Sequence, residues 1–162
     1  MTIACGNNKE GFSVENIVGL AVKIEQAGKK FYSSLAIQEV NQPVQDLFAY
    51  LASEEGTHIK SFENLTFILK DEGLNACDGE YMEYLDAIIG SHIFFQQDPD
   101  DLERIETVRE ALEMAIRFER DSIMVFNDLM PLVGEKGKEV LRNLIIQEQV
   151  HIRKLAHAFG QF

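Results

Sequence analysis

The chain has 162 residues, enough for one domain with a sizeable core, and its formal net charge is −12. This acidity argues against a nucleic-acid partner and against an anionic membrane surface, because both need clustered lysine and arginine. No run approaches the roughly 18 apolar residues of a membrane span, and the first ten residues lack the apolar core of a signal peptide. Cys5 and Cys77 form no CxxC pair, so a reducing cytoplasm is expected and neither cysteine is assigned a role.

The first part of the chain predicts an antiparallel pair of helices over about 13–72. Apolar residues recur at helical spacing from Val14 to Leu35, and Ser13 is a plausible N-cap. Asn41 to Pro43 interrupts this pattern and suits the turn into a second helix. Glycines from Gly73 to Gly79 then indicate a break.

A connector over about 73–106 separates this pair from the next one. Within it, the stretch from about Glu80 to Ile89 predicts a short extra helix. Gln97 to Asp101 indicates a second break, in which Asp98 and Pro99 resemble a cap followed by a first-turn proline. The connector is long enough to cross a bundle.

The last part of the chain predicts a second helical hairpin over about 107–160. Thr107 and Glu110 fit a capping box at the start of a helix from about Val108 to Met130. Pro131 and the stretch Gly134 to Gly137 indicate a tight connection, and a last helix covers roughly Lys138 to Phe159. No alternating pattern predicts a strand, so the fold class is all-α.

An internal repeat relates the two hairpins. Ala21 to Glu25 (AVKIE) aligns with Ala115 to Glu119 (AIRFE), and Glu55 to Lys60 (EGTHIK) aligns with Glu148 to Arg153 (EQVHIR). The two blocks recur at nearly the same offset. The chain therefore reads as one domain of two helical hairpins that arose by duplication.

The repeated blocks carry residues suited to metal binding. Glu55 and His58 lie three residues apart, as do Glu148 and His151, so each pair shares one helix face. Glu25 and Glu119 each lie on an apolar stripe, where an ionised carboxylate is costly unless something compensates it. Two divalent cations would balance four carboxylates. The predicted site comprises Glu25, Glu55, His58, Glu119, Glu148 and His151. The alternative is two surface pairs with two half-exposed glutamates.

One glutamate from each of two helices and Glu-x-x-His from the other two is an established ligand pattern of di-iron bundles. With Glu25 to Tyr32 (EQAGKKFY) and Ala115 to Ser122 (AIRFERDS), the six positions resemble the ferritin-like superfamily, closest to its rubrerythrin-like branch. The resemblance implies a left-handed four-helix bundle with a di-iron centre and oxygen or peroxide chemistry. It implies that Glu55 and Glu148 bridge two metals, or lie beside the bridge.

In the same pattern Glu25 and Glu119 would be terminal or bridging carboxylates, and His58 and His151 would each bind one metal. Two metal ions per chain are expected, as iron, with manganese or zinc left open by the ligand set. Tyr32, seven residues after Glu25, is either a hydrogen-bond donor to a ligating carboxylate or a core aromatic residue.

The chain departs from rubrerythrins at two points. Rubrerythrins usually carry a C-terminal rubredoxin domain with four cysteines, so an external electron donor such as a rubredoxin-like protein is expected here. They also tend to have an extra glutamate where this chain has Ser122, which puts their carboxylate-to-histidine switching in doubt. The remaining six-ligand set is equally similar to that of bacterioferritin, where it serves iron oxidation.

Three functions follow from these patterns. The first is an oxidoreductase that reduces peroxide or oxygen, and the second is a ferroxidase or iron-handling protein. The third is a non-catalytic helical module stabilised by metal. A homodimer is also expected, because a bundle with a long crossover can exchange hairpins between chains. For Glu54 and Gln147, exposed helix positions are favoured over a role in orienting a histidine ring, and for His92 a structural role is favoured.

Overall fold

The computed structural model describes residues 14–39, 41–75, 79–92 and 105–162, and no strand occurs within these ranges. The chain is all-α, as the sequence predicts. Ser13, Cys5, Cys77 and the expected break from Gln97 to Asp101 lie outside the described residues. The described elements are α1 (Val14–Gln38), α2 (Gln42–Glu72), α3 (Gly79–Gly90), α5 (Val108–Leu129), the 3₁₀ turn η2 (Met130–Leu132) and α6 (Glu135–Phe159).

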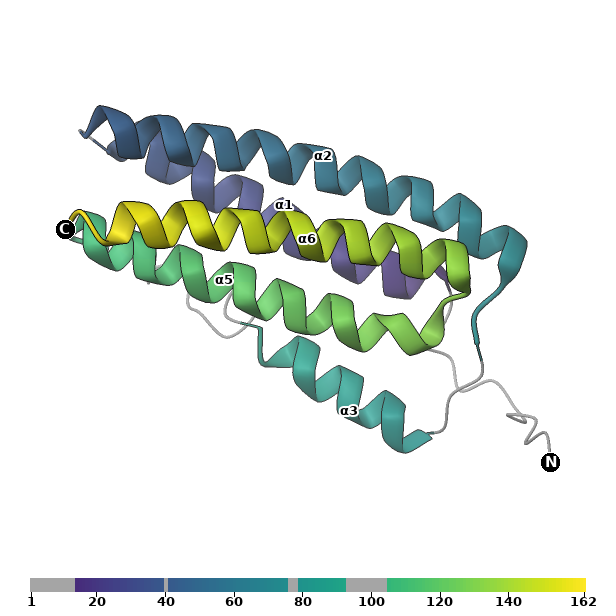
Figure 1. The fold of residues 1–162 in the computed structure, drawn as a ribbon. Coiled ribbons are helices and arrows are strands. Elements are labelled where there is room, and N and C mark those ends of the chain that lie inside the picture. The colour runs from purple at the N-terminus through teal and green to yellow at the C-terminus, as the bar shows by residue number, and fades with distance from the viewer. Residues whose placement is uncertain (1–13, 40, 76–78, 93–104) are drawn as a thin grey trace.

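The four long helices form a bundle of two antiparallel hairpins (Figure 1). Helix α1 packs against α2, and α5 packs against α6. The hairpins then meet along two further seams, α2 against α6 and α1 against α5. Helices α2 and α5 run in one direction and α1 and α6 in the other, so every packed pair of long helices is antiparallel (Figure 1). This is a ferritin-like arrangement.

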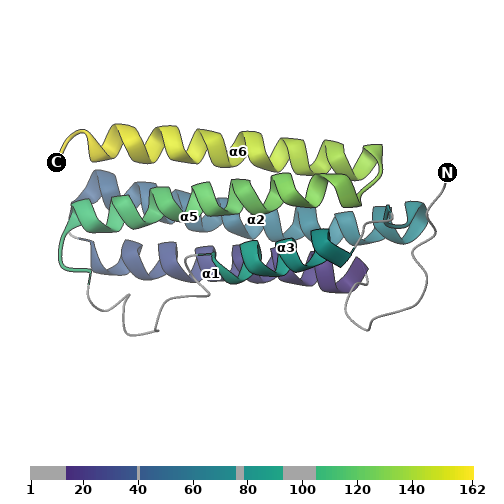
Figure 2. The ribbon, with the colours of Figure 1, turned by 90° about the horizontal axis from the view of Figure 1, so that it is seen from below.

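The parallel direction of α2 and α5 requires a connection along the length of the bundle, since α2 ends at the end of the bundle opposite the start of α5 (Figure 1). Helix α3 lies within this connection, outside the bundle and beside α5 (Figures 1 and 2). The Tyr81 hydroxyl donates a 2.7 Å hydrogen bond to the backbone carbonyl of Asp128. That bond fastens α3 to the end of α5.

Local sequence sets the helix ends. The Asn41 side chain accepts a hydrogen bond from the backbone N–H of Val44 and caps α2, while Thr107 and Glu110 form the expected capping box of α5. Helix α2 ends at Gly73, whose φ of 78° suits glycine. None of the described helices combines the length and the apolar character that a membrane-spanning segment needs.

The start of the last helix corrects the sequence prediction. Helix α6 begins at Glu135 rather than near Lys138, so Gly137 lies in its first turn instead of in the connection. A Cβ atom on Gly137 would lie 2.8 Å from Cβ of Val133. Gly137 is therefore a glycine because of close packing against Val133. In the sequence the same residue indicates a turn.

The core is apolar except at its centre. Its largest fully buried side chains include Phe31, Phe48, Phe62, Phe118 and Phe126, contributed by α1, α2 and α5. Phe62 and Phe126 pack with ring centroids 5.1 Å apart. Among these apolar groups lie the buried glutamates and histidines of the repeat.

Candidate metal centre

The structure brings all six predicted residues into one buried cluster, and each is at most 1% exposed. Every long helix contributes. Glu25 comes from α1, and Glu119 comes from α5. The Glu-x-x-His pairs come from α2 and α6, the two helices that pack together across the hairpins. The alternative of exposed surface pairs is wrong. We refer to Glu25, Glu55, His58, Glu119, Glu148 and His151 as the six-residue cluster.

One half of the cluster surrounds the inner ring nitrogen of His58. Nδ1 of His58 lies 3.2 Å from Oε2 of Glu25. It lies 3.5 Å from Oε2 of Glu55 and 2.9 Å from Oε1 of Glu148. Each of these four residues offers one donor atom, and the four atoms lie within 4.8 Å of one another. This group could hold one metal ion.

The other half is its counterpart from the second hairpin. Nδ1 of His151 lies 2.8 Å from Oε2 of Glu148 and 3.4 Å from Oε1 of Glu119. Together with Glu55, these residues form a second group whose donor atoms lie within 4.8 Å of one another. Glu55 and Glu148 therefore belong to both groups. A cation held by either group would therefore have both of these carboxylates among its ligands.

Proton sharing compensates the buried charges when no cation is bound. Burial raises the pKa of Glu25 well above its ordinary value, and repulsion from Glu55 adds to this. Burial and repulsion from Glu148 raise the pKa of Glu119 in the same way. Burial would also raise the pKa of Glu148, but hydrogen bonds with His151 and His58 outweigh it and lower this pKa to about 2.

His58 complements this pattern. Burial disfavours its charged form, yet hydrogen bonds to Glu148 and Glu25 raise its pKa above the ordinary value. These shifts favour the charged forms of His58 and Glu148 and the neutral forms of Glu25 and Glu119. Metal ligands must be deprotonated, so cations entering the cluster would displace these protons.

Several buried oxygens in the cluster make no hydrogen bond. Both carboxylate oxygens of Glu55 are among them, as are Oε1 of Glu25 and Oε2 of Glu119. Buried acceptors without partners are rare because each costs about 1–3 kcal/mol. Carboxylate and imidazole donors suit iron, manganese or zinc. The donor set and its unsatisfied oxygens therefore fit a pair of such ions.

Tyr32 and Gly28 shape the cluster from α1. The Tyr32 hydroxyl donates a 2.7 Å hydrogen bond to Oε1 of Glu119, on the opposite hairpin rather than on its own helix. A Cβ atom on Gly28 would overlap Cζ of Phe118 and would lie 3.4 Å from Cδ of Glu55. The glycine thus leaves room for the Phe118 ring beside the cluster.

The outer nitrogens of the two histidines face residues that the sequence analysis placed at exposed positions. Nε2 of His58 donates a 3.2 Å hydrogen bond to Oε1 of Gln147. Nε2 of His151 lies 3.9 Å from Oε2 of Glu54. Each of these residues directly precedes a motif glutamate, and that adjacency is the only sign of them in the sequence.

His92 follows α3 and is fully buried against α5. Its Nε2 lies 3.4 Å from the Ser122 hydroxyl, and its ring meets Phe118 edge-on with centroids 5.5 Å apart. Ser122 also donates a 3.0 Å hydrogen bond to the backbone carbonyl of Phe118. Burial lowers the pKa of His92 to about 4, so this imidazole is neutral.

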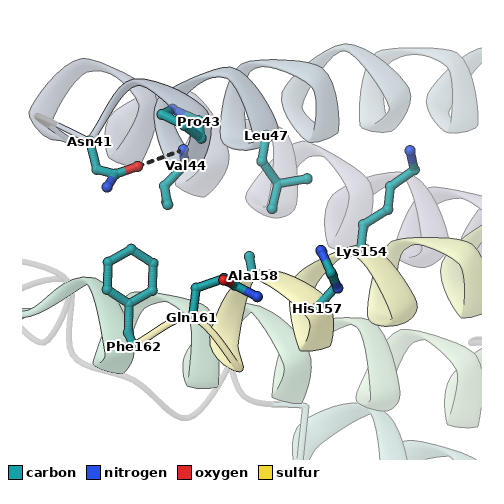
Figure 3. Close-up of a pocket in the computed structure, with 9 residues that line it drawn as sticks. All are labelled: Asn41, Pro43, Val44, Leu47, Lys154, His157, Ala158, Gln161 and Phe162. Carbon is teal, nitrogen blue, oxygen red and sulfur yellow. Dashed lines mark hydrogen bonds between the residues drawn. The ribbon is translucent and has the colours of Figure 1, made fainter.

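A separate groove lies at the end of the bundle, between the start of α2 and the end of α6 (Figure 3). Its volume is about 560 Å³. Val44, Leu47 and Phe162 give it an apolar lining, while Lys154 and His157 lie on its α6 side (Figure 3). None of the six-residue cluster lines this groove, so it is distinct from the candidate metal centre.

A family model described as Rubrerythrin matches residues 16–159. The match covers nearly the whole chain. It includes α2, α5, α6, all but the first two residues of α1, and every residue of the cluster. No curated protein and no solved structure matches the chain.

Proposed function

This chain belongs to the rubrerythrin family, a ferritin-like di-iron family, and from that premise we propose that it is an oxidoreductase. In this proposal the six-residue cluster would hold two iron ions, and the chemistry that they would supply is the reduction of peroxide or oxygen. Electrons come from an external donor. The two overlapping donor groups that share Glu55 and Glu148 carry the proposal. Four carboxylates balance the charge of two divalent ions, which isolated Glu-x-x-His pairs would not do.

The chain's own residues have defined tasks in this site. His58 and His151 each present an inner nitrogen to one ion position, and Tyr32 holds the Glu119 carboxylate by its hydrogen bond. Burial of the whole cluster keeps bulk water away from it. Bound iron would supply the two electrons that, with two protons, convert one hydrogen peroxide to two waters.

We propose that the electron donor is an external rubredoxin-like iron site that lies outside these 162 residues. Such a site needs four cysteines, and these residues contain two. A homodimer is part of the same proposal. Light scattering on the purified protein measures it directly.

The deciding experiment combines metal analysis with turnover. The metal-free chain is loaded with ferrous iron under anaerobic conditions, and bound metal is measured by elemental analysis. Hydrogen peroxide is then added with and without a reduced rubredoxin. We expect two ions per chain and repeated peroxide consumption only with the donor. Fewer than two ions, or no turnover with a competent donor, would count against the proposal.

Ser122 favours a second candidate, the oxidation of ferrous iron for storage or transfer. The serine hydroxyl bonds the Phe118 carbonyl and contacts His92, so this position offers no additional carboxylate. The family resemblance links that carboxylate to peroxidase activity. Stoichiometric iron oxidation without donor-dependent turnover, together with a large shell-like assembly in light scattering, would favour this second function.

A further inference from the structure

The two histidines of the cluster are held in a crossed arrangement. His58 lies on α2, and its outer nitrogen donates to Gln147 on α6. His151 lies on α6, and its outer nitrogen faces Glu54 on α2. The rings lie stacked between these two groups, with centroids 5.4 Å apart and planes 20° apart. Each helix therefore supplies a polar group to the histidine of the other.

The orientation of Gln147 fixes the proton on His58. The Gln147 amide nitrogen donates a 3.3 Å hydrogen bond to the backbone carbonyl of Asn143, one turn earlier on α6. The amide oxygen must then face the ring. It can only accept there, so Nε2 of His58 carries hydrogen. When a cation displaces the second proton of this ring, the lone pair is left on Nδ1, which points into the cluster.

Glu54 lies on the corresponding side of His151 and brings a carboxylate instead of an amide. Its Oε2 is 3.9 Å from Nε2, beyond hydrogen-bond distance, so it acts on the ring through its charge. Its side chain is 30% exposed, so the carboxylate lies at the boundary between the cluster and solvent. Burial and the nearby Glu54 carboxylate raise the pKa of Tyr50, and the Tyr50 ring meets His151 edge-on at a centroid distance of 6.2 Å. Lys154 lies 4.8 Å from the centroid of that ring.

We propose that Gln147 and Glu54 are positioning residues that hold His58 and His151 in the metal-binding tautomer, and that their different chemistry makes the two metal positions unequal. The position bound by His151 takes its cation more tightly. This inference rests on the two-metal site of the proposed function but not on its redox activity.

The physical reason lies in the acceptor beyond each ring. A carboxylate that faces the outer N–H of an imidazole draws the proton toward itself and raises the electron density at the inner nitrogen. It also places a negative charge near the cation, at the edge of a low-dielectric site. A neutral amide fixes the tautomer equally well but adds no charge. The duplicated site is thus symmetric in its ligands and asymmetric around them.

Exchanging the two groups tests the proposal. The variants are Glu54→Gln, Gln147→Glu and the double swap, each close in size to the original and located at a partly exposed position. Glu63→Gln on α2 and Gln149→Glu on α6 are matched controls, because they make the same charge changes at exposed positions of the same helices. Circular dichroism confirms that each variant is folded.

Calorimetric titration of the metal-free full-length chain with Zn²⁺ measures the two binding steps. Nitrogen NMR of the histidine rings, assigned with His58→Asn and His151→Asn, shows which imidazole binds first. We expect His151 to respond first in the unmodified chain. Glu54→Gln should weaken the tighter step about tenfold, and Gln147→Glu should strengthen the weaker step. The double swap should reverse the order of the two histidines.

The outcomes separate the two proposals. If the chain binds two ions but the exchanged variants behave like the two controls, Glu54 and Gln147 do not make the two metal positions unequal in affinity. The two-metal site is then still supported. If His58 responds first in the unmodified chain, the inequality is also wrong. If the unmodified chain binds fewer than two Zn²⁺ ions, the two-metal site itself fails, and this inference fails with it.

Discussion

The hydroxyl of Tyr32 donates a 2.7 Å hydrogen bond to Oε1 of Glu119, a residue 87 positions away on the other hairpin. Both groups are fully buried. This hydrogen bond joins α1 of the first hairpin to α5 of the second, beside the contacts that His58 on α2 makes with Gln147 and Glu148 on α6. The repeat counterpart of Tyr32 is Phe126, which has no hydroxyl, so only one of the two outer glutamates is held in this way.

Removal of this hydroxyl should destabilise the metal-free protein. Tyr32→Phe leaves a buried carboxylate oxygen without its donor, and we expect a loss of about 1–3 kcal/mol in the free energy of unfolding. Urea denaturation measures it. Tyr84→Phe is the control, because its hydroxyl bonds Asp128 in an exposed position and should matter much less. Equal stability of Tyr32→Phe and the unmodified chain would show that this hydrogen bond does not contribute to the free energy of unfolding.

Shared and unshared glutamates should differ in their effect on metal content. Glu55 and Glu148 belong to both donor groups, whereas Glu25 belongs to one. We expect Glu25→Ala to retain about one ion per chain, and Glu55→Ala or Glu148→Ala to bind less than that. Elemental analysis after reconstitution gives the stoichiometry.

The control for this series is Glu63→Ala, which removes an exposed carboxylate from α2. It should bind as much metal as the unmodified chain. Unchanged content in Glu55→Ala would remove Glu55 from the site. A loss of both ions in Glu25→Ala would show that the two positions fill only together.

Metal removal should lower the thermal stability. A ligand that binds only the folded state at a free concentration 100-fold above its Kd stabilises by about 2.7 kcal/mol. For a domain of this size that corresponds to a rise in Tm of several degrees per ion. Thermal melts before and after chelation, with metal loss verified by elemental analysis, measure the shift. An identical melt after complete removal would be incompatible with metal binding in the buried cluster.

The close approach at Gly28 should not tolerate a methyl group. In Gly28→Ala the new Cβ would overlap the Phe118 ring, which is buried and has little room to move. We expect a loss of about 1–3 kcal/mol in stability. Gly19→Ala on the same helix is the matched control, because no atom beyond its chain neighbours and the local helix backbone lies within 4 Å of its Cβ position. That change should be neutral or stabilising by about 0.4–1 kcal/mol. Similar stabilities of the two variants would show that Phe118 moves aside freely.

The sequence predicted most of the fold because its signals are local. Helical spacing, the Asn41 turn and the Thr107 capping box each act within a few residues, and the structure has all three. The start of α6 was predicted near Lys138, three residues after its actual start at Glu135, because Gly137 was interpreted as part of a turn. The contact with Val133 requires a glycine at position 137, and the spacing of apolar residues along the chain does not reveal that contact.

The candidate site also contains residues that the sequence predicts and residues whose contacts depend on how the helices pack. The repeat identified the six residues of the cluster, because an inward position on one hairpin implies its counterpart on the other. Gln147 and Glu54 were placed at exposed positions, since their contacts cross from α6 to α2 and depend on the register of the two helices. Tyr32 was recognised as a possible donor, but its acceptor on α5 depends on how the hairpins pack.

The sharing of Glu55 and Glu148 also bears on how such a chain arises. Each donor group takes three residues from one hairpin and one glutamate from the other. A single hairpin would lack its fourth donor, while two copies side by side would complete both groups at once. The present chain thus has the form expected from joining the genes of a two-chain ancestor whose metal centre lay at the interface.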